Sequence, residues 1–247
     1  MELYTRTDIG LVRKSNQDSV DGGFLYDKKV MWAVLCDGMG GANGGNVASQ
    51  TAVAVAKENM ITFDKRANDY ESEAFLKGIV EKANTAIYQR QKQEFTLQGM
   101  GTTMELIVVN KGWAMIAHVG DSRVYRIHNG RIRQLTTDHS VVQEMVSRGE
   151  LTPEQARVHP NKNYITRAVG VAEDIQIDYI EAPFSDEDIL IACSDGLTNY
   201  ITDETILSFS GQVYGERLAY ALTEQAKLNG GGDNISVVVM YANTIRE

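Results

Sequence analysis

Three aspartates lie beside glycine where hydrophobic runs end or begin. They are Asp37, Asp195 and Asp233, in the segments Cys36-Asp37-Gly38-Met39-Gly40-Gly41, Ser194-Asp195-Gly196-Leu197 and Gly230-Gly231-Gly232-Asp233-Asn234. A carboxylate at a strand end, next to residues that let the backbone bend sharply, can point into a shared cleft. One such Asp-Gly pair alone is best explained as a turn. The three together predict a site for hard divalent cations.

The donor atoms indicate which cation this site would hold. Carboxylate oxygens suit Mg²⁺ or Mn²⁺, and no set of Cys and His residues at zinc-ligand spacing accompanies them. Calcium stays open as an alternative. However, the calcium-hand loop with its spaced aspartates and terminal glutamate is absent, and ligands scattered along the chain fit a preformed cleft better.

Further charged residues fall at the boundaries of expected elements. Asp121 lies in the motif Gly-Asp-Ser-Arg and Asp138 in Thr-Asp-His-Ser, where each could be a turn or helix-capping residue. Near the N-terminus, Arg13 precedes Asp18 and follows an apolar stretch. The guanidinium of Arg13 could present its planar fork to a phosphate, and Asp18 could hold a metal-bound water.

The composition fits one large domain. The chain has 247 residues, 43% of them hydrophobic, and only three prolines, with no Pro-rich or Ser/Gly-rich linker. We therefore expect a single domain over residues 1–247. The formal charge is −9, from 33 acidic and 24 basic residues, which argues against nucleic acid as the main ligand.

The cysteines and the apolar runs indicate in which cellular compartment the protein acts. Cys36 and Cys193 lie inside apolar runs, so we expect buried, reduced thiols and no disulfide framework. The N-terminal segment has no apolar signal region, and no apolar stretch approaches the roughly 20 residues of a membrane span. We expect a soluble, cytoplasmic protein without a membrane partner. We also expect a monomer.

Hydrophobic periodicity predicts grouped strands and helices. The expected strands cover residues 3–12, 30–36, 102–109, 113–119, 123–128, 131–135, 175–180, 189–193 and 235–241, with Asp37 closing the second. The expected helices cover residues 45–60, 70–93, 140–148, 153–157 and 215–228. Turn signals make the strands within 102–135 an antiparallel meander. Because strands and helices are grouped and do not alternate, an α+β fold of antiparallel sheets with helices outside is favoured.

Taken in order, these motifs resemble the metal-dependent Ser/Thr protein phosphatases of the PPM type, in their compact bacterial form. Seven segments carry the resemblance: 13–18, 37–41, 100–103, 120–123, 138–140, 194–197 and 232–236. The resemblance implies a four-layer αββα sandwich, in which antiparallel helix pairs flank two antiparallel β-sheets. It also implies a flap subdomain at about residues 147–168.

The resemblance implies a ligand set for two Mn²⁺ or Mg²⁺ ions, with a third in some relatives. Asp37 would bridge the two ions, and Gly38 would supply a backbone carbonyl. Asp195 and Asp233 would complete the shell of the first ion. Asp121, together with Asp195, matches the position that binds a third, weaker ion.

The resemblance also implies how a phosphorylated substrate would be hydrolysed. Arg13 would grip the phosphate, Asp18 would act through water, and Asp138 would orient a metal-bound water. A bridging water would lose a proton near neutral pH and attack phosphorus in line, with no phosphoenzyme. The implied substrates are proteins that carry phosphoserine or phosphothreonine, and the implied counterpart is a bacterial Ser/Thr kinase.

One departure from the family concerns the acid that protonates the leaving group. Many members carry a histidine just after the first Asp-Gly pair, where this chain has Met39 and Ala42. The four histidines, at positions 118, 128, 139 and 159, are expected to be structural or to face the substrate. A metal-bound water is the remaining candidate for the acid.

The basic residues of the flap have two interpretations, and two further functions of the whole protein are considered. Basic residues in the flap could help to choose phosphopeptides, or could form a solvated surface; they are Arg148, Arg157, His159, Lys162 and Arg167. A catalytically silent relative that binds phosphoproteins is the second functional hypothesis. The third is a phosphatase of the same fold that acts on a small phosphorylated molecule.

Overall fold

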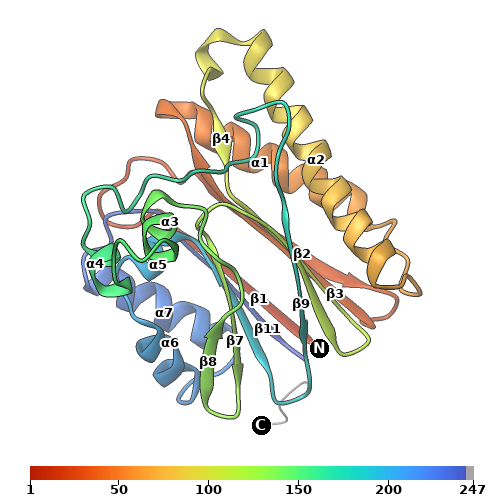
Figure 1. The fold of residues 1–247 in the computed structure, drawn as a ribbon. Coiled ribbons are helices and arrows are strands. Elements are labelled where there is room, and N and C mark those ends of the chain that lie inside the picture. Colours follow the sequence, from red (N-terminus) through yellow and green to blue (C-terminus); the bar gives the residue numbers. More distant parts are fainter. Residues whose placement is uncertain (243–247) are drawn as a thin grey trace.

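The computed structural model describes residues 1–242, without the side chains of residues 42 and 43. Two sheets are packed face to face, with helices on both outer faces (Figure 1). All strand pairs within the sheets are antiparallel. The four-layer α+β sandwich expected from the motifs is confirmed.

The first sheet has the order β2-β3-β5-β6-β9, and β4 pairs with β3. Its strands are β2 (Asp18–Leu25), β3 (Val30–Met39), β4 (Gly101–Thr102), β5 (Met104–Asn110), β6 (Trp113–Val119) and β9 (Asp178–Pro183). The second sheet has the order β1-β11-β10-β7-β8. Its strands are β1 (Glu2–Asp8), β7 (Arg123–His128), β8 (Arg131–Gln134), β10 (Ile189–Cys193) and β11 (Ile235–Tyr241).

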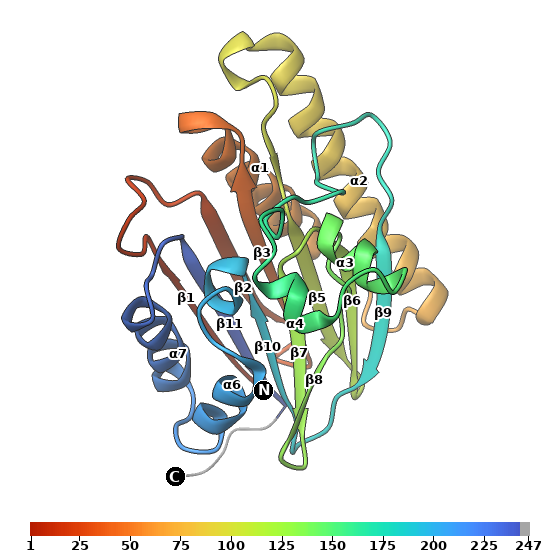
Figure 2. The same cartoon turned by 60° about the vertical axis from the view of Figure 1, so that its left-hand side comes forward.

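Two long helices cover the first sheet, and a second group covers the other (Figure 1). The long pair is α1 (Gly41–Met60) and α2 (Asp69–Gln93); the second group contains α5 (Asp195–Thr198), α6 (Asp203–Ser210) and α7 (Glu216–Leu228). Two short helices, α3 (Val141–Ser147) and α4 (Pro153–Arg157), lie between the helical layers in the view of Figure 2. Among residues 1–242, no helix has the length and apolar character needed to cross a membrane.

Strand β3 shows how the sequence builds three apolar layers. Met31, Ala33 and Leu35 pack between the two sheets, while Val34 and Cys36 face the helices α1 and α2. Alternate side chains of a strand point to opposite faces, so a strand buried on both faces is apolar throughout. A third apolar layer lies between the second sheet and the helices α6 and α7.

Two expected strand ends were wrong. The first strand ends at Asp8, not at residue 12, because Gly10 has a positive φ of 77° and turns against the backbone carbonyl of Asp233. Asp37 does not close its strand, since β3 continues to Met39 through pairing of Gly38 with Thr102. Asp37 is thus held rigidly inside a sheet.

The expected meander over residues 102–135 was also wrong. Strands β5 and β6 pair in one sheet and β7 and β8 in the other. The chain changes sheets at Gly120, whose positive φ of 117° and whose contact with Thr103 leave no room for a side chain. Asp121 therefore lies where the two sheets meet.

The sequence patterns did not predict β2, α5 or α6, and placed β9 at 175–180. Strand β2 contains two glycines and two aspartates, residues that are depleted in strands, and it forms because it pairs along its whole length with β3. The positions of the remaining helices and strands agree with the expected ranges to within a few residues. Pairing between distant segments overrode local propensity in β2.

Candidate metal centre

The ends of strands from both sheets bring the predicted carboxylates together. Asp18 and Asp37 are partners across β2 and β3, Asp195 follows β10, and Asp233 precedes β11. Asp37, Asp195 and Asp233 line a cleft of about 410 Å³, whereas Asp18 is buried and does not belong to the described lining. The lining residues of the cleft are Arg13, Gln17, Asp37, Gly38, Met39, Gly40, Gly41, Thr103, Asp121, Asn163, Ile165, Asp195, Asp233 and Asn234.

Asp37 is fixed at its backbone by two threonines. Its N–H donates to Oγ1 of Thr103 at 2.9 Å, and its carbonyl accepts from the Thr103 N–H and the Thr102 hydroxyl, each at 2.9 Å. Burial and the negative charges of the neighbouring aspartates raise the pKa of Asp37 well above its ordinary value. A carboxylate held this firmly cannot move away from its neighbours.

Asp18 is buried with one oxygen unpaired. Its Oδ2 accepts from the hydroxyl of Ser194 at 2.8 Å, while Oδ1 has no hydrogen-bond partner among the described atoms. Burial and the charges of Asp195 and Asp233 raise the pKa of Asp18 to about 7, against the lowering effect of serine hydroxyls. A buried carboxylate oxygen without a donor fits a site that takes a water or a cation.

The carboxyl groups of Asp121 and Asp195 also have raised pKa values. Burial and the charges of Asp195 and Asp138 raise the pKa of Asp121 well above its ordinary value. Burial and the charge of Asp233 likewise raise the pKa of Asp195, against the lowering effect of the hydrogen bond from Asn199. Divalent cations would reverse this repulsion, because their charge favours the ionised form of each ligand.

The donor set fits hard cations that keep part of their water. Among the described residues 1–242, no group of three or more Asp, Glu, His or Cys side chains is arranged so that it could hold a metal ion. Mg²⁺ is usually held by one or two carboxylates and several waters, so pairs of carboxylates around the cleft suffice. Gly38 lies against the backbone of Gly45 so closely that a Cβ would meet its carbonyl at 2.1 Å, which keeps the Gly38 backbone at the cleft.

Arg13 reaches the same cleft from the loop after β1. Its Nη2 donates to Oδ2 of Asp233 at 2.7 Å, and its side chain is 51% exposed. The hydrogen bond to Asp233 raises the pKa of Arg13, so its charge is permanent. The structure therefore places Arg13 at the mouth of the cleft, with its guanidinium directed at a predicted ligand.

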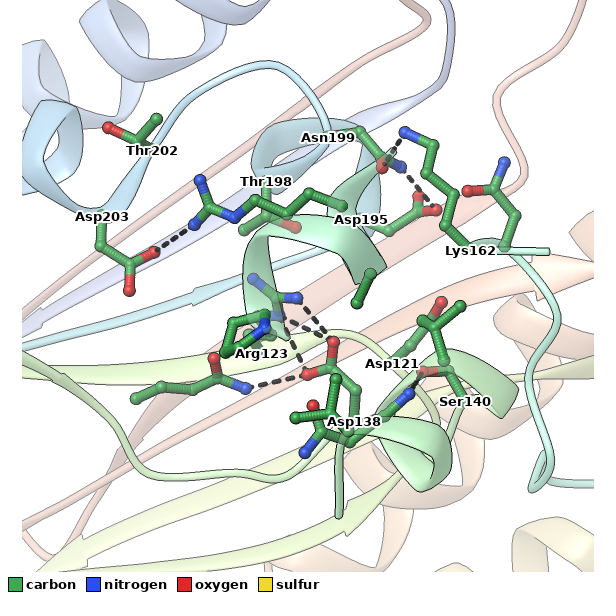
Figure 3. Close-up of a pocket in the computed structure, with 18 of the residues that line it drawn as sticks. Asp121, Arg123, Asp138, Ser140, Lys162, Asp195, Thr198, Asn199, Thr202 and Asp203 are labelled. Atoms are coloured by element: carbon green, nitrogen blue, oxygen red, sulfur yellow. Dashed lines mark hydrogen bonds and ion pairs between the residues drawn. The ribbon is translucent and has the colours of Figure 1, made fainter. Parts of the chain in front are cut away.

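Asp138 lies in a neighbouring cavity of about 360 Å³ that Asp121 and Asp195 also line (Figure 3). Its carboxylate accepts from Nε and Nη2 of Arg123 at 2.6–3.0 Å and from Nε2 of Gln134 at 2.8 Å. Asp138 thus stands beside the predicted third-ion position, and its main partner is Arg123.

Several side chains that support the site were not predicted. Asn234 ties down the loop that carries Arg13: its Nδ2 donates to the carbonyls of Ile9 and Ser15 at 3.0 Å, and its Oδ1 accepts from the Gln17 N–H at 2.8 Å. Ser194 and Thr103 anchor Asp18 and Asp37 in the same way. Each lies inside a motif that was recognised for its aspartate or glycine, so its position in the motif was the available signal.

The segment 147–168 contributes Lys162 to the site. Lys162 donates to Oδ1 of Asn199 at 2.8 Å, and Nδ2 of Asn199 donates to Oδ2 of Asp195 at 2.9 Å (Figure 3). Other basic groups of this segment have acidic partners: Arg148 pairs with Glu150 at 2.8 Å, and Arg157 lies 3.9 Å from Asp203. Lys162 thus connects this segment to Asp195, whereas Arg148 and Arg157 form largely exposed ion pairs.

Histidine is absent from the described lining of the cleft. His118 and His139 are buried, and His128 pairs with the buried Asp188 at 2.8 Å. Met39 lines the cleft where many family members have histidine, whereas the side chain of Ala42 lies outside the described residues. None of these three histidine side chains belongs to the described lining of the cleft or of the cavity beside it.

Comparison with known proteins identifies the family. A family model described as protein phosphatase 2C matches residues 12–228. The chain belongs to this family. Its member in Listeria innocua, serine/threonine phosphatase stp, is 37% identical over 251 residues, which cover 100% of this chain and 98% of the relative. The PPM-type resemblance of the motifs is confirmed.

Solved structures of serine/threonine phosphatases share the fold over nearly the whole chain. The serine/threonine phosphatase PstP/Ppp of Mycobacterium tuberculosis is 35% identical, with a TM-score of 0.87 over 96% of this chain and 97% of that one. A structure of the PstP catalytic domain in complex with two manganese ions is 34% identical, with a TM-score of 0.85 and 96% coverage of both chains. Metal binding in a relative of this similarity agrees with the donor set described above.

Proposed function

We propose that this chain hydrolyses phosphoserine and phosphothreonine in proteins with the help of two Mn²⁺ or Mg²⁺ ions. The observation that carries the proposal is the convergence of Asp37, Asp195 and Asp233 at one cleft beside Arg13, with the buried Asp18 next to Asp37 on the neighbouring strand. The family, whose relatives in Listeria and Streptococcus are named protein phosphatases, makes the enzyme a protein-serine/threonine phosphatase. When bound, the ions would supply an activated bridging water and neutralise phosphate charge.

The ligands of the proposed ions would be oxygen atoms from both sheets. Asp37 would bridge the pair, the carbonyl of Gly38 would join it, and Asp195 and Asp233 would complete one shell. Asp121 and Asp195 would hold a third ion. The raised pKa values of Asp37, Asp121 and Asp195 support this assignment, because each reflects burial together with the negative charge of neighbouring carboxylates, which a cation would neutralise.

The chain's own residues would bind and orient the phosphate. Arg13 has further N–H groups besides the one that contacts Asp233, and a guanidinium can present two parallel donors to phosphate oxygens. Asp18 would orient a water through its unpaired Oδ1, and Asp138 would do so beside Asp121. In these positions the side chains would hold the reacting groups in line.

No protein nucleophile is required for the proposed reaction. Cys36 and Cys193 are free and buried, and burial raises the pKa of the Cys36 thiol well above its ordinary value. Since the described lining of the cleft contains neither cysteine nor histidine, water would attack phosphorus and the leaving alkoxide would take its proton from water. Hydrolysis would then pass through no phosphoenzyme.

We further propose the setting in which this activity operates. The substrates would be cytoplasmic phosphoproteins, a bacterial Ser/Thr kinase would be the functional counterpart, and the protein would act as a monomer. Residues 1–247 would form one domain whose flap, at about 147–168, selects phosphopeptides. The contact from Lys162 through Asn199 to Asp195 supports a link between this segment and the cleft.

The test is hydrolysis of a phosphothreonine peptide with Mn²⁺ and with a chelator. Asp195→Ala and Asp233→Ala should abolish a chelator-sensitive activity, and Asp64→Ala, at an exposed ion pair far from the cleft lining, is the matched control. Activity that survived both the substitutions and the chelator would refute the metal mechanism. Phosphopeptide binding without turnover would favour a silent binding module, and faster turnover of small phosphate esters would favour a small-molecule phosphatase.

A further inference from the structure

A buried pair of ionisable residues lies in the middle of the first sheet. Glu105 on β5 and His118 on β6 are cross-strand partners, both fully buried, and Nδ1 of His118 lies 2.6 Å from Oε1 of Glu105. The other oxygen of Glu105 has no hydrogen-bond partner among the described atoms. Such a pair seldom adds stability, because apolar residues of similar size usually serve a core at least as well. A role other than stability is therefore indicated.

The second ring nitrogen of His118 binds the segment that carries Asp138. Nε2 lies 2.9 Å from the backbone carbonyl of Thr137, the residue before Asp138. Both partners of the ring are acceptors when Glu105 is ionised, so the pair must hold one proton between Nδ1 and Oε1 besides the one on Nε2. Burial lowers the pKa of His118, but the charge and hydrogen bond of Glu105 outweigh burial and raise it to about 9. The contact with Thr137 is thus maintained at neutral pH.

The same segment is joined to the turn that carries Asp121. The N–H of His139 donates to the carbonyl of Gly120 at 2.8 Å, and the N–H of Gly120 donates to Nδ1 of His139 at 3.0 Å. The ring of His139 lies 4.4 Å from that of His118. Residues on either side of Asp138 are therefore tied to the sheet and to the residue before Asp121.

We propose that His118, paired with Glu105, is a positioning residue that fixes residues 137–139 and thereby the spacing between the carboxylates of Asp121 and Asp138. Its consequence for catalysis rests on the proposed function, since these two carboxylates are assigned to the third ion and its water. Loss of the Glu105–His118 pair should weaken the affinity for this third ion. It should leave the carboxylates of Asp37 and Asp233 in place. Residues that orient metal ligands typically change affinity or activity roughly 10- to 100-fold when replaced.

The experiment compares the parent protein with a double variant, Glu105→Leu with His118→Leu, and with His128→Gln. His128 also pairs with a buried carboxylate, that of Asp188, but it does not line the cleft. Amide hydrogen exchange on the metal-free proteins should be roughly 10-fold faster at residues 136–139 in the double variant only. The Mn²⁺ concentration for half-maximal activity should rise about 10-fold, with the rate restored by excess Mn²⁺.

Two results would overturn the proposal. One is a folded double variant whose exchange at residues 136–139 and whose Mn²⁺ response match the parent. The other is a double variant that fails to fold, because the pair would then be required for stability. His118→Gln gives an independent check: its amide can still donate to the Thr137 carbonyl, and it should keep slow exchange. The exchange measurement needs no turnover, so a parent that failed to hydrolyse phosphopeptides would refute the proposed function and not the positioning role.

Discussion

Nη2 of Arg13 lies 2.7 Å from Oδ2 of Asp233, although 220 residues separate the two in the chain. The contact joins the loop after β1 to the residues that lead into β11, at the mouth of the carboxylate cleft. An ion pair this exposed to solvent contributes little stability. Its importance is that one carboxylate faces both the proposed phosphate-binding arginine and the proposed metal site.

Arg13→Ala should reduce phosphopeptide hydrolysis without destabilising the fold. We expect a loss of roughly 10²-fold in kcat/KM, the size seen when one preorganised donor to a developing anion is removed. The free energy of unfolding should change by no more than about 1 kcal/mol. Arg13→Lys should recover only part of the rate, because an ammonium cannot present two parallel donors. Equal rates for the parent enzyme, Arg13→Lys and Arg13→Ala would show that the guanidinium does not contact phosphate.

The carboxylate cluster predicts opposite pH dependence with and without metal. Asp18 has a folded-state pKa of about 7 against 3.8 ordinarily, so the metal-free folded state binds its proton more tightly than the unfolded state does. The metal-free protein should therefore lose stability as pH rises from about 4 to about 7. Mn²⁺ should raise the melting temperature, and by more at pH 8 than at pH 5, because its ligands must be deprotonated. If the rise in melting temperature on adding Mn²⁺ in place of chelator were the same at pH 5 and pH 8, the assignment of these carboxylates as metal ligands would be contradicted.

Gly38 and Gly78 offer a matched pair of substitutions. A Cβ at Gly38 would lie 2.1 Å from the carbonyl of Gly45 and 2.7 Å from that of Gln17, so Gly38→Ala must displace the backbone at the cleft. We expect a loss of more than about 2 kcal/mol in the free energy of unfolding. Gly78 lies in α2 with no atom within 4 Å of the added Cβ, and Gly78→Ala should stabilise by about 0.5–1 kcal/mol. Urea unfolding measures both; a harmless Gly38→Ala would mean that the close packing is not required.

Asn234→Ala should free the loop that carries Arg13. The side chain makes three hydrogen bonds to the backbone of Ile9, Ser15 and Gln17, and its loss leaves those groups unpaired. We expect about 1–3 kcal/mol of destabilisation in urea, with faster amide exchange at residues 9–17. Asn234→Asp keeps the acceptor for the Gln17 N–H but lacks the donors to Ile9 and Ser15. Its free energy of unfolding should therefore lie between those of the parent and Asn234→Ala. Unchanged exchange in the loop would show that other contacts hold it.

Most of the fold could be predicted because the apolar periodicity of a strand or helix is visible within a short stretch of sequence. Strands such as 189–193 and 235–241, which are apolar except for Ser236, agree with β10 and β11. Strand β2 could not be found this way, since its glycines and aspartates are stabilised by pairing with β3. The crossing of the chain between sheets at Gly120 was also hidden, because a hairpin and a change of sheet have similar turn residues.

Residues of the candidate site could be predicted where they are themselves part of a recognisable sequence motif. The aspartates and Arg13 were identified from their motifs. The structure brings Arg13 and five of the aspartates to adjoining cavities, and Asp18 is buried beside Asp37 on the neighbouring strand. Partners from distant segments, such as Arg123 for Asp138 and Ser194 for Asp18, follow from the packing of the two sheets. The buried partnership of Glu105 with His118 likewise depends on the register of β5 and β6, which no local pattern specifies.

The most direct test of the proposed centre is a crystal structure of the protein with Mn²⁺, with ions located by anomalous scattering. We predict two strong peaks at the cleft with an oxygen of Asp37 between them, and Asp195 and Asp233 coordinating one of the two. In Asp37→Asn the pair of peaks should be lost or reduced to one. A parent crystal with no peak beside Asp37, or with peaks that Asp195 and Asp233 do not contact, would contradict the two-ion assignment.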